Sequence, residues 1–138
     1  TDFVLANFSG ANLELADFSS SRLRNANLTR ANLRKARFFN ADLRGANFTG
    51  ANLNDVSFRS ADLRGANLSG AKLNNVRVDV LTKLTGANLT NAILVDVDFS
   101  GSDLTRANLT GASLTGAKID KATLCNTITP WGLDNYGC

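Results

Sequence analysis

The chain has 138 residues, of which 43% are hydrophobic and 20% charged, and its 15 basic and 12 acidic side chains give a net charge of +3. This size and composition are typical of one soluble domain, with no run of 18 apolar residues to span a membrane and no leader resembling a signal peptide. Histidine is absent and the two cysteines, Cys125 and Cys138, lie near the C-terminus. General-base, thiol and transition-metal chemistry is therefore excluded from the body of the chain.

Large apolar residues recur at every fifth position along almost the whole chain. With each of them called a centre, i, there are 16 centres before a one-residue insertion and nine after it. The centres are Phe3, Phe8, Leu13, Phe18, Leu23, Leu28, Leu33, Phe38, Leu43, Phe48, Leu53, Phe58, Leu63, Leu68, Leu73, Val78, Leu84, Leu89, Leu94, Phe99, Leu104, Leu109, Leu114, Ile119 and Leu124. All eighteen alanines lie at i−2, and nine of the eleven glycines lie at i+2. Position i−1 is mostly Asn or Asp, and i+1 is mostly polar.

A period of five excludes a helix, because successive centres would be rotated by about 140° around a 3.6-residue helix and would cover its whole surface. The period also differs from the alternation of an ordinary strand. It predicts a three-residue strand followed by a two-residue turn, with i−2 and i pointing inward and i−1 outward. Glycine at i+2 then takes the third position of a β-turn, where a type II turn requires a positive φ.

Four pentads per coil bring like residues onto the same face. Reading every twentieth residue gives a core ladder of Phe18, Phe38, Phe58, Val78 and, after the insertion, Phe99. Another face carries Asn at every i−1 position from Asn7 to Asn108, with Ser or Thr at i+1, which predicts stacked amide ladders along the axis. The insertion predicts a bulge at one corner near residues 79–83 that leaves the order of the faces unchanged.

Tandem copies such as Ala-Asn-Leu-Thr-Arg, Ala-Asp-Leu-Arg-Gly and Ala-Asn-Phe-Thr-Gly resemble the pentapeptide-repeat family, over residues 1–126. The resemblance implies an all-β fold, a right-handed quadrilateral parallel β-helix. At four pentads per coil the 25 centres make about six coils, and stacking at about 4.8 Å gives a rod roughly 30 Å long.

Residues 127–138 break the period and predict a short C-terminal helical cap. Thr129 fits the N-cap, Pro130 the first helical position and Gly137 the position after the end of the helix. The side chains of Trp131, Leu133 and Tyr136 are then expected to cover the last coil. No such cap is visible at the N-terminal end.

The cysteines allow two interpretations. A disulfide between Cys125 and Cys138 would close a short loop and hold the cap, for about 2 to 4 kcal/mol, whereas a reducing compartment would leave two free thiols. The ending is similar to that of pentapeptide-repeat proteins of the plant and cyanobacterial thylakoid lumen, whose last repeat also runs into Leu-Cys-Asn-Thr and a closing Gly-Cys. This resemblance implies a thylakoid-lumen address, with the bacterial periplasm as the alternative.

Charge is distributed unevenly along the chain. Residues 22–77 hold eleven basic and three acidic side chains, whereas residues 1–21 carry a net charge of −3 and residues 78–138 of −2. Arg24, Arg44 and Arg64 stack by the twenty-residue rule, with Asp42 and Asp62 nearby. They form either a solvated charge ladder, partly neutralised by those aspartates, or an interaction stripe for an anionic partner.

Several functional classes are disfavoured by the residues present. Family members that mimic DNA and bind topoisomerases need an acidic surface, and this one is basic. Nucleic-acid binding is not expected, because no aromatic platform alternates with the arginines. Catalysis lacks a positioned base and a pocket, and Asp96 and Asp98 are interpreted as exposed solubilising acids. An Asn and Ser/Thr array also resembles the surfaces of ice-binding proteins, which we weigh lightly.

The sequence therefore predicts a non-enzymatic module that presents flat faces to an unidentified protein partner, without a cofactor and without a catalytic or metal site. The alternative is a cation- or ligand-binding regulatory protein of the lumen. A monomer is favoured. The outward apolar residues are either contact points for a partner or simply pack beside their neighbours; they are Leu15, Phe39, Val80, Leu81 and Val95.

Overall fold

Each pentad folds as a short extended segment followed by a β-turn. The N–H of Ala6 donates to the C=O of Phe3 at 3.0 Å, and the same bond from position i+3 to i recurs along the chain. Every i+2 residue except Val80 has a φ between 54° and 74°. Asn, Asp, Ser and Lys occupy this left-handed position as well as Gly, so the turn is imposed by the coil and only made easier by glycine.

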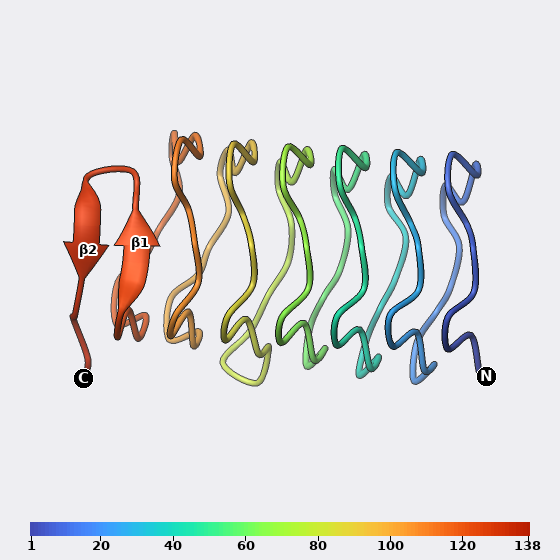
Figure 1. The fold of residues 1–138 in the computed structure, drawn as a ribbon, viewed down its shortest axis with the longest axis horizontal. Coiled ribbons are helices and arrows are strands. Elements are labelled where there is room, and N and C mark those ends of the chain that lie inside the picture. The colour runs from blue at the N-terminus through green and yellow to red at the C-terminus, as the bar shows by residue number, and fades with distance from the viewer.

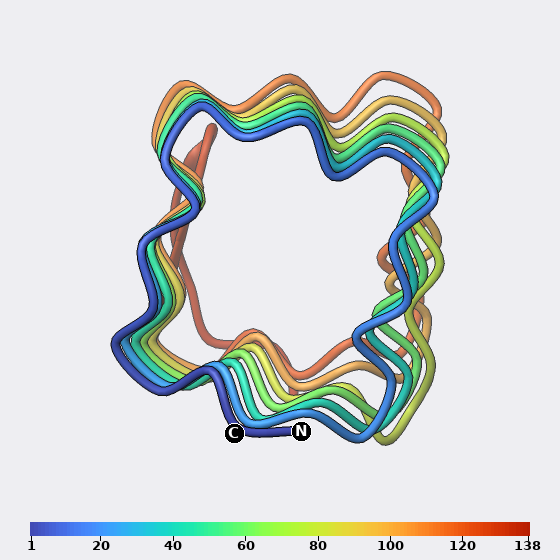
Figure 2. The ribbon, with the colours of Figure 1, turned by 90° about the vertical axis from the view of Figure 1, so that its right-hand side faces the viewer.

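The computed structural model describes all 138 residues and shows the pentads wound into stacked coils. The coils form a rod with the N-terminus at one end and the C-terminus at the other (Figure 1), and the cross-section is close to a square (Figure 2). Parallel bridges join i−1 residues of successive coils, twenty residues apart before the insertion and twenty-one across it. The structure contains no helix, and so no helix that is long and apolar enough to cross a membrane.

The outward i−1 residues define four walls. Wall one is Asp2, Arg22, Asp42, Asp62, Lys83, Asp103 and Thr123. Wall two is Asn7, Asn27, Asn47, Asn67, Asn88, Asn108 and Ile128. Wall three is Asn12, Asn32, Asn52, Lys72, Ile93 and Ser113. Wall four is Asp17, Arg37, Ser57, Arg77, Asp98 and Lys118, and between Arg77 and Asp98 the bridge is missing.

Centres and i−2 alanines fill the interior as one core of 36 buried residues. Under wall four, the rings of Phe18 and Phe38 stack with centroids 5.2 Å apart, and those of Phe38 and Phe58 lie 5.3 Å apart. The neighbouring Phe48 ring meets Phe38 and Phe58 edge-on, at 6.0 Å from each. These contacts bury large apolar surfaces in the geometry that aromatic pairs prefer.

The insertion opens wall four locally. Val78 N–H and Asp98 N–H make none of the ladder bonds that their counterparts make in other coils, such as Phe58 N–H to Arg77 C=O at 2.8 Å. The Asp79 carboxylate instead accepts the N–H of Ser60 at 2.9 Å, and the Asp79 C=O accepts the N–H of Thr82 at 3.0 Å. We call this interruption between Arg77 and Asp98 the gap. Wall one resumes directly after it, because Asp62 pairs with Lys83.

The C-terminal segment is not a helix, so the predicted helical cap is wrong. It is a hairpin of β1 (Thr127–Thr129) and β2 (Gly132–Asp134), paired antiparallel. The reason is that Ile128 still belongs to the ladder: its N–H donates to Ala107 C=O at 3.0 Å and its C=O accepts from Leu109 N–H at 2.6 Å. Strand geometry is thereby fixed up to Thr129, and Pro130 with Trp131 is left for a tight turn, a position that suits the restricted φ of proline.

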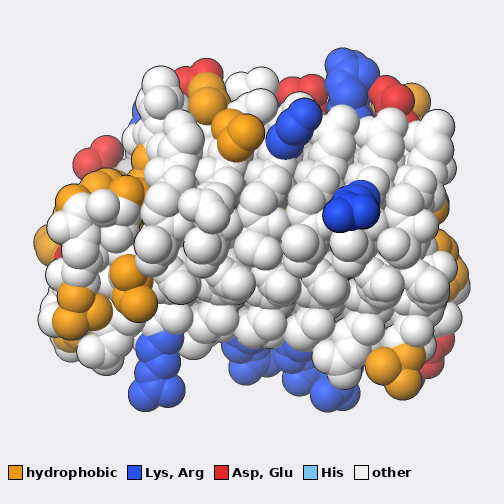
Figure 3. Space-filling view, turned by 45° about the horizontal axis from the view of Figure 1, so that its top comes forward, with side chains coloured by type: hydrophobic (Ala, Val, Ile, Leu, Met, Phe, Trp, Pro, Cys, Tyr) orange, Lys and Arg blue, Asp and Glu red, His pale blue; other side chains and the backbone are white.

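The two ends of the rod are less well covered than its middle. The first coil has half-buried centres at Phe3, Phe8 and Leu13, and Leu5 is 72% exposed. At the other end, Trp131, Leu133 and Tyr136 are 60%, 66% and 61% exposed, so most of their surface faces solvent and not the last coil. Hydrophobic side chains accordingly gather at the C-terminal end in Figure 3.

Candidate functional site: the four outer walls

The interior offers no binding site. Its only cavity measures about 10 Å³, lies beside the gap and is lined by hydrophobic side chains alone, including Phe58, Val78 and Phe99. That volume is at the lower limit for a single water molecule. No group of three or more His, Cys, Asp or Glu side chains that could hold a metal ion is present. Functional chemistry must therefore lie on the walls.

Asn and Asp at i−1 serve first to hold their own corner. In wall two the Asn47 side-chain oxygen accepts the N–H of Thr49 at 3.0 Å and its hydroxyl at 2.6 Å, and the equivalent backbone bond recurs from Asn7 to Asn108. Such a local bond from a side chain to the backbone two residues ahead is the known preference of Asn and Asp in turns. This role was not predicted, although the near-constant Asn or Asp before each centre is a signal for it.

The predicted amide ladder is found mainly on a different wall. On wall three, Asn32 donates to Asn12 and Asn52 donates to Asn32, both at 3.1 Å. On wall two only Asn88 donates to Asn67, at 3.2 Å. The oxygens of Asn47, Asn88 and Asn108 there each accept two bonds, from the N–H and the hydroxyl of the Thr two residues ahead. A broad surface without charged side chains occupies much of the face seen in Figure 3, where Lys and Arg side chains stand along the lower edge and at a few places above it.

The predicted stripe of Arg24, Arg44 and Arg64 is largely neutralised. Arg44 holds Asp42 through Nε at 2.8 Å and Nη2 at 2.6 Å, and Arg64 holds Asp62 with the same two groups. Only Arg24 has no acidic partner within 4.0 Å. The bidentate geometry is that of a strong Arg–carboxylate pair. This stripe is therefore a zwitterionic ladder and not a row of free cations.

These pairs change the titration of the carboxylates. Hydrogen bonds from the Arg44 side chain lower the pKa of Asp42 against the opposing effect of burial. For Asp62, burial is the largest influence and would raise its pKa, but hydrogen bonds from Arg64 outweigh it and the pKa is lowered. On wall four, hydrogen bonds from Ser19 and then from Arg37 lower the pKa of Asp17 to about 2.

Six basic side chains of residues 22–77 have no ion pair, and three of them lie on or beside wall four, the others being Arg24, Arg30 and Lys72. Five arginines of residues 22–77 have a carboxylate within 4.0 Å, whereas Lys35, Arg59 and Arg77 have none. An open depression of about 570 Å³ lies beside Lys35, Arg37 and Arg77, with Asp55 as its one acidic neighbour. Its basic lining was not predicted, because the sequence analysis considered one line of arginines and not two adjacent lines.

Beyond the gap, wall four turns acidic. A second open depression, of about 470 Å³, adjoins Arg59 and Arg77 on one side and Asp79, Asp96 and Asp98 on the other. Asp96 and Asp98 are exposed and have no ion-pair partner within 4.0 Å. Hydrogen bonds from Ser100 lower the pKa of Asp98.

Four of the five outward apolar residues are exposed, at 68% for Leu15, 53% for Phe39, 69% for Val80 and 63% for Leu81. Val95 is half-buried. Phe39 and Val80 both lie along the corner that follows wall four, two coils apart.

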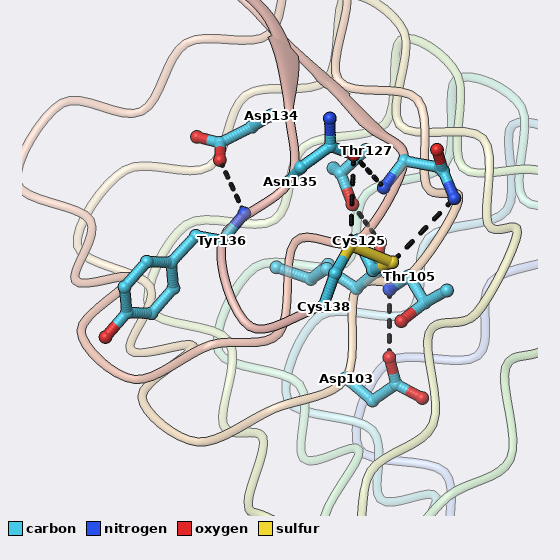
Figure 4. Close-up of a disulfide and its surroundings, with 10 residues drawn as sticks. Asp103, Thr105, Cys125, Thr127, Asp134, Asn135, Tyr136 and Cys138 are labelled. Atoms are coloured by element: carbon cyan, nitrogen blue, oxygen red, sulfur yellow. Dashed lines mark hydrogen bonds between the residues drawn. A yellow bond between two sulfur atoms is a disulfide. The ribbon is translucent and has the colours of Figure 1, made fainter.

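The C-terminal hairpin is fastened to the last coil. Cys125 and Cys138 form a disulfide with Cα atoms 4.9 Å apart (Figure 4). Next to it, Leu124 N–H donates to Tyr136 C=O at 2.7 Å, and Asn126 N–H donates to the side-chain oxygen of Asn135 at 3.0 Å. These bonds continue the pairing of coils up to the end of the chain.

A repeat of five residues, four to a coil, with a filled interior and polar walls defines a quadrilateral β-helix whose chemistry is confined to its surface. Comparison with known proteins agrees. A model described as a pentapeptide repeat region matches residues 1–68, and one described as pentapeptide repeats, in eight copies, matches residues 82–120 and 92–128. The chain belongs to the pentapeptide-repeat family, whose members form right-handed quadrilateral β-helices and are generally non-enzymatic.

Solved structures add relatives from photosynthetic organisms. HetL of the cyanobacterium Nostoc sp. strain PCC 7120, described as involved in heterocyst differentiation regulation, is 35% identical with a TM-score of 0.60. The match covers 95% of this chain and 62% of HetL, so this chain spans less than two thirds of that relative's length.

Two further structures align less well. A pentapeptide-repeat protein of the Arabidopsis thaliana thylakoid lumen is 34% identical, with 80% of this chain and 63% of that one covered and a TM-score of 0.33. Rfr23 of the cyanobacterium Cyanothece 51142 is 36% identical, with 70% and 54% covered and a TM-score of 0.34. A search of curated proteins finds no match.

Proposed function

We propose that this protein is a non-enzymatic interaction module that presents its walls to a protein partner. The observation that carries the proposal is the filled interior: a cavity of about 10 Å³ leaves no room for a substrate or cofactor, so recognition has only the walls to use. Regular coil spacing fixes the wall side chains in position before a partner arrives, which lowers the entropic cost of association.

We further propose a thylakoid-lumen address, with the periplasm as the alternative. The proposal is supported by the Cys125–Cys138 disulfide, which persists in oxidising compartments, and by the likeness of the Leu-Cys-Asn-Thr ending to lumen proteins. A thiol titration of protein isolated without reductant tests it. The expected result is no free thiol, and two free thiols would contradict an oxidising compartment.

Affinity capture with two matched baits tests the interaction role. The first bait is the native chain, and the second carries Arg24→Glu, which reverses the one unpaired cation of the predicted stripe without touching the core. We expect a lumenal or periplasmic protein to bind the native chain saturably. If the Arg24→Glu bait no longer captures that protein, the corner beside wall one contributes to the binding. Absence of saturable binding to any protein of either compartment would contradict the proposal.

No geometry favours the alternative of a cation-binding regulator, because the acidic side chains do not form a cluster suited to a metal ion.

A further inference from the structure

The charges of wall four follow an order that is complementary to its own reverse. Along the rod, the signs of Asp17, Arg37, Ser57, Arg77, Asp98 and Lys118 run negative, positive, neutral, positive, negative, positive. When this line is turned end over end, each charge meets an opposite charge or a neutral side chain. Asp17 faces Lys118 of the second copy, Arg37 faces Asp98, and Ser57 faces Arg77.

The two flanking lines obey the same rule. Before the strand, the corner residues are Leu15, Lys35, Asp55, Asn75, Asp96 and Gly116. After the strand, they are Ser19, Phe39, Arg59, Asp79, Ser100 and Asp120. In the same reversed register Lys35 faces Asp96 of the second copy and Arg59 faces Asp79. No like charges meet on any of the three lines.

We propose that wall four is the interface of an antiparallel homodimer, with a two-fold axis in the plane of the wall between the levels of Ser57 and Arg77. Such an interface is isologous, so each favourable pair occurs twice. Opposite charges across an interface fix its register and exclude other registers. The proposal departs from the monomer favoured by the sequence analysis and is independent of the proposed function.

The proposed register makes the most opposite-charge pairs: moving the axis by one whole level keeps like charges apart but overlaps only four of the six levels and leaves two kinds of pair in place of four. Moving it by half a level fails on charge. Moving the axis to the level of Arg77 places that side chain against its own symmetry mate, and moving it to the level of Ser57 sets Arg37 against Arg77. On wall one, the signs from Asp2 to Asp103 form a palindrome, so reversal about the middle of these six residues sets like charge against like at every level. Reversal about the middle of all seven residues, which include Thr123, sets Asp62 against its own symmetry mate. Wall two has no charged side chain at all.

Four of the charged groups required are free to take part. Lys35, Arg59, Asp96 and Asp98 have no ion-pair partner within 4.0 Å in the single chain, and all four are exposed. They differ in this from Asp2, Asp42 and Asp62 of wall one, which already hold arginines. Unsatisfied charges of both signs on one wall are what a partner of matching pattern neutralises.

Apolar contact and area support the same arrangement. Val80 lies over Gly101, since a Cβ built there would stand 2.9 Å from Val80 Cγ1. The proposed register brings Phe39 to the level of Ser100 and Gly101 of the second copy, and so to Val80. One wall of four carries roughly a sixth of the 6642 Å² of accessible surface, which is comparable to the ~800 Å² per partner of a standard interface.

Sedimentation equilibrium with charge-swapped variants tests the proposal. The native chain is expected to dimerise with concentration at an ionic strength of about 0.02 M and to dissociate at about 0.5 M, where salt screens exposed charges. Lys35→Glu and Asp96→Lys are each expected to raise the dimer Kd about tenfold or more, because each places two like-charge pairs in the dimer. The double variant restores the pairs with reversed sign and should dimerise like the native chain.

Lys72→Glu is the matched control, since Lys72 is also exposed and unpaired but lies on wall three. It should leave the Kd unchanged, and circular dichroism should show that every variant is folded. The proposal is overturned if the native chain stays monomeric at about millimolar concentration in low salt, if Lys72→Glu weakens the dimer as much as Lys35→Glu does, or if the double variant fails to recover.

Discussion

Wall four differs on the two sides of Val78, although its residues occupy equivalent positions. Before Val78, the rings of Phe18, Phe38 and Phe58 stack in order and the ladder of backbone bonds above them is complete. After it, a smaller centre and one inserted residue remove two ladder bonds and leave a cavity of about 10 Å³. The difference teaches that the square coil needs both a filled interior and a constant repeat length at each level.

The interruption of the ladder stays local because hydrogen bonds from side chains replace the missing backbone bonds. The Asp79 carboxylate accepts from Ser60 and Leu81, and Thr82 donates its hydroxyl hydrogen to Phe58 C=O at 3.0 Å. Wall one then continues in register through Lys83. The regular half and the gap are therefore expected to respond differently to the same kind of perturbation.

The largest effect is expected from a charge in the regular interior. Leu53 has no exposed surface, so Leu53→Arg buries an unpaired cation and should prevent folding, at a cost above about 4 kcal/mol. Thr49→Arg, on the outer corner nearby, should fold normally. Soluble yield and circular dichroism of the two variants check this, and equal yields would contradict the inward assignment of the centres.

Truncation of the core ladder compares its two halves directly. Phe38→Ala removes a fully buried ring between two stacked neighbours and should cost about 3 to 5 kcal/mol. Val78→Ala, at a half-buried centre beside the existing cavity, should cost about 1 kcal/mol. Urea unfolding measures both. A loss at Val78 as large as that at Phe38 would mean that the gap is closed in solution.

Removal of the Asp79 carboxylate should widen the gap. Asp79→Ala deprives two backbone N–H groups of their acceptor and is expected to cost about 1 to 3 kcal/mol. Asp120→Ala is the matched control, because Asp120 occupies the same corner line and its carboxylate makes no hydrogen bond; it should change stability by less than about 0.5 kcal/mol. Equal effects of the two substitutions would refute the replacement role of Asp79.

Acid should lower the stability of the fold by protonating carboxylates that are hydrogen-bonded in the folded chain. Asp17, Asp42 and Asp79 all have a lowered pKa in the folded chain, that of Asp17 at about 2. A lowered folded pKa contributes stability that is present above the unfolded value of about 3.9 and is lost as the pH falls through the folded value. Unfolding free energy should therefore stay level from pH 7 to about 5 and decline below about pH 4. A decline that begins near pH 6 would show that other groups dominate.

The smallest expected effect is a difference in amide hydrogen exchange, which can be measured in the native chain without a substitution. Val78 N–H and Asp98 N–H have no acceptor, whereas Phe38 N–H and Phe58 N–H donate to the next coil at 2.8 Å. In native-state hydrogen exchange the first pair should exchange by local opening, well before the second. Equal protection would indicate that the gap holds ordered acceptors.

Much of the fold was readable in the sequence because the period of five constrains every residue. The twenty-residue stacking of Phe18, Phe38 and Phe58 and the positive φ at i+2 follow from pattern alone. The helical cap was mispredicted because Thr129, Pro130 and Gly137 suit a helix locally, while the twenty-residue rule, which places Ile128 beside Asn108, was not applied beyond the last centre at Leu124. Partial neutralisation of Arg44 and Arg64 by Asp42 and Asp62 was one of the two interpretations of the sequence, and the choice between them depends on side-chain rotamers and not on spacing.

The bridges between coils carry a consequence for how the chain acquires its shape. Every one of them joins residues twenty or twenty-one positions apart, so no coil waits for a remote segment to be synthesised. Winding can begin in any coil and spread by adding one neighbour at a time, as in other solenoids. A nascent chain that leaves a ribosome or a translocation pore can thus fold coil by coil as it emerges. The disulfide at the last residues can form only after the final coil has emerged.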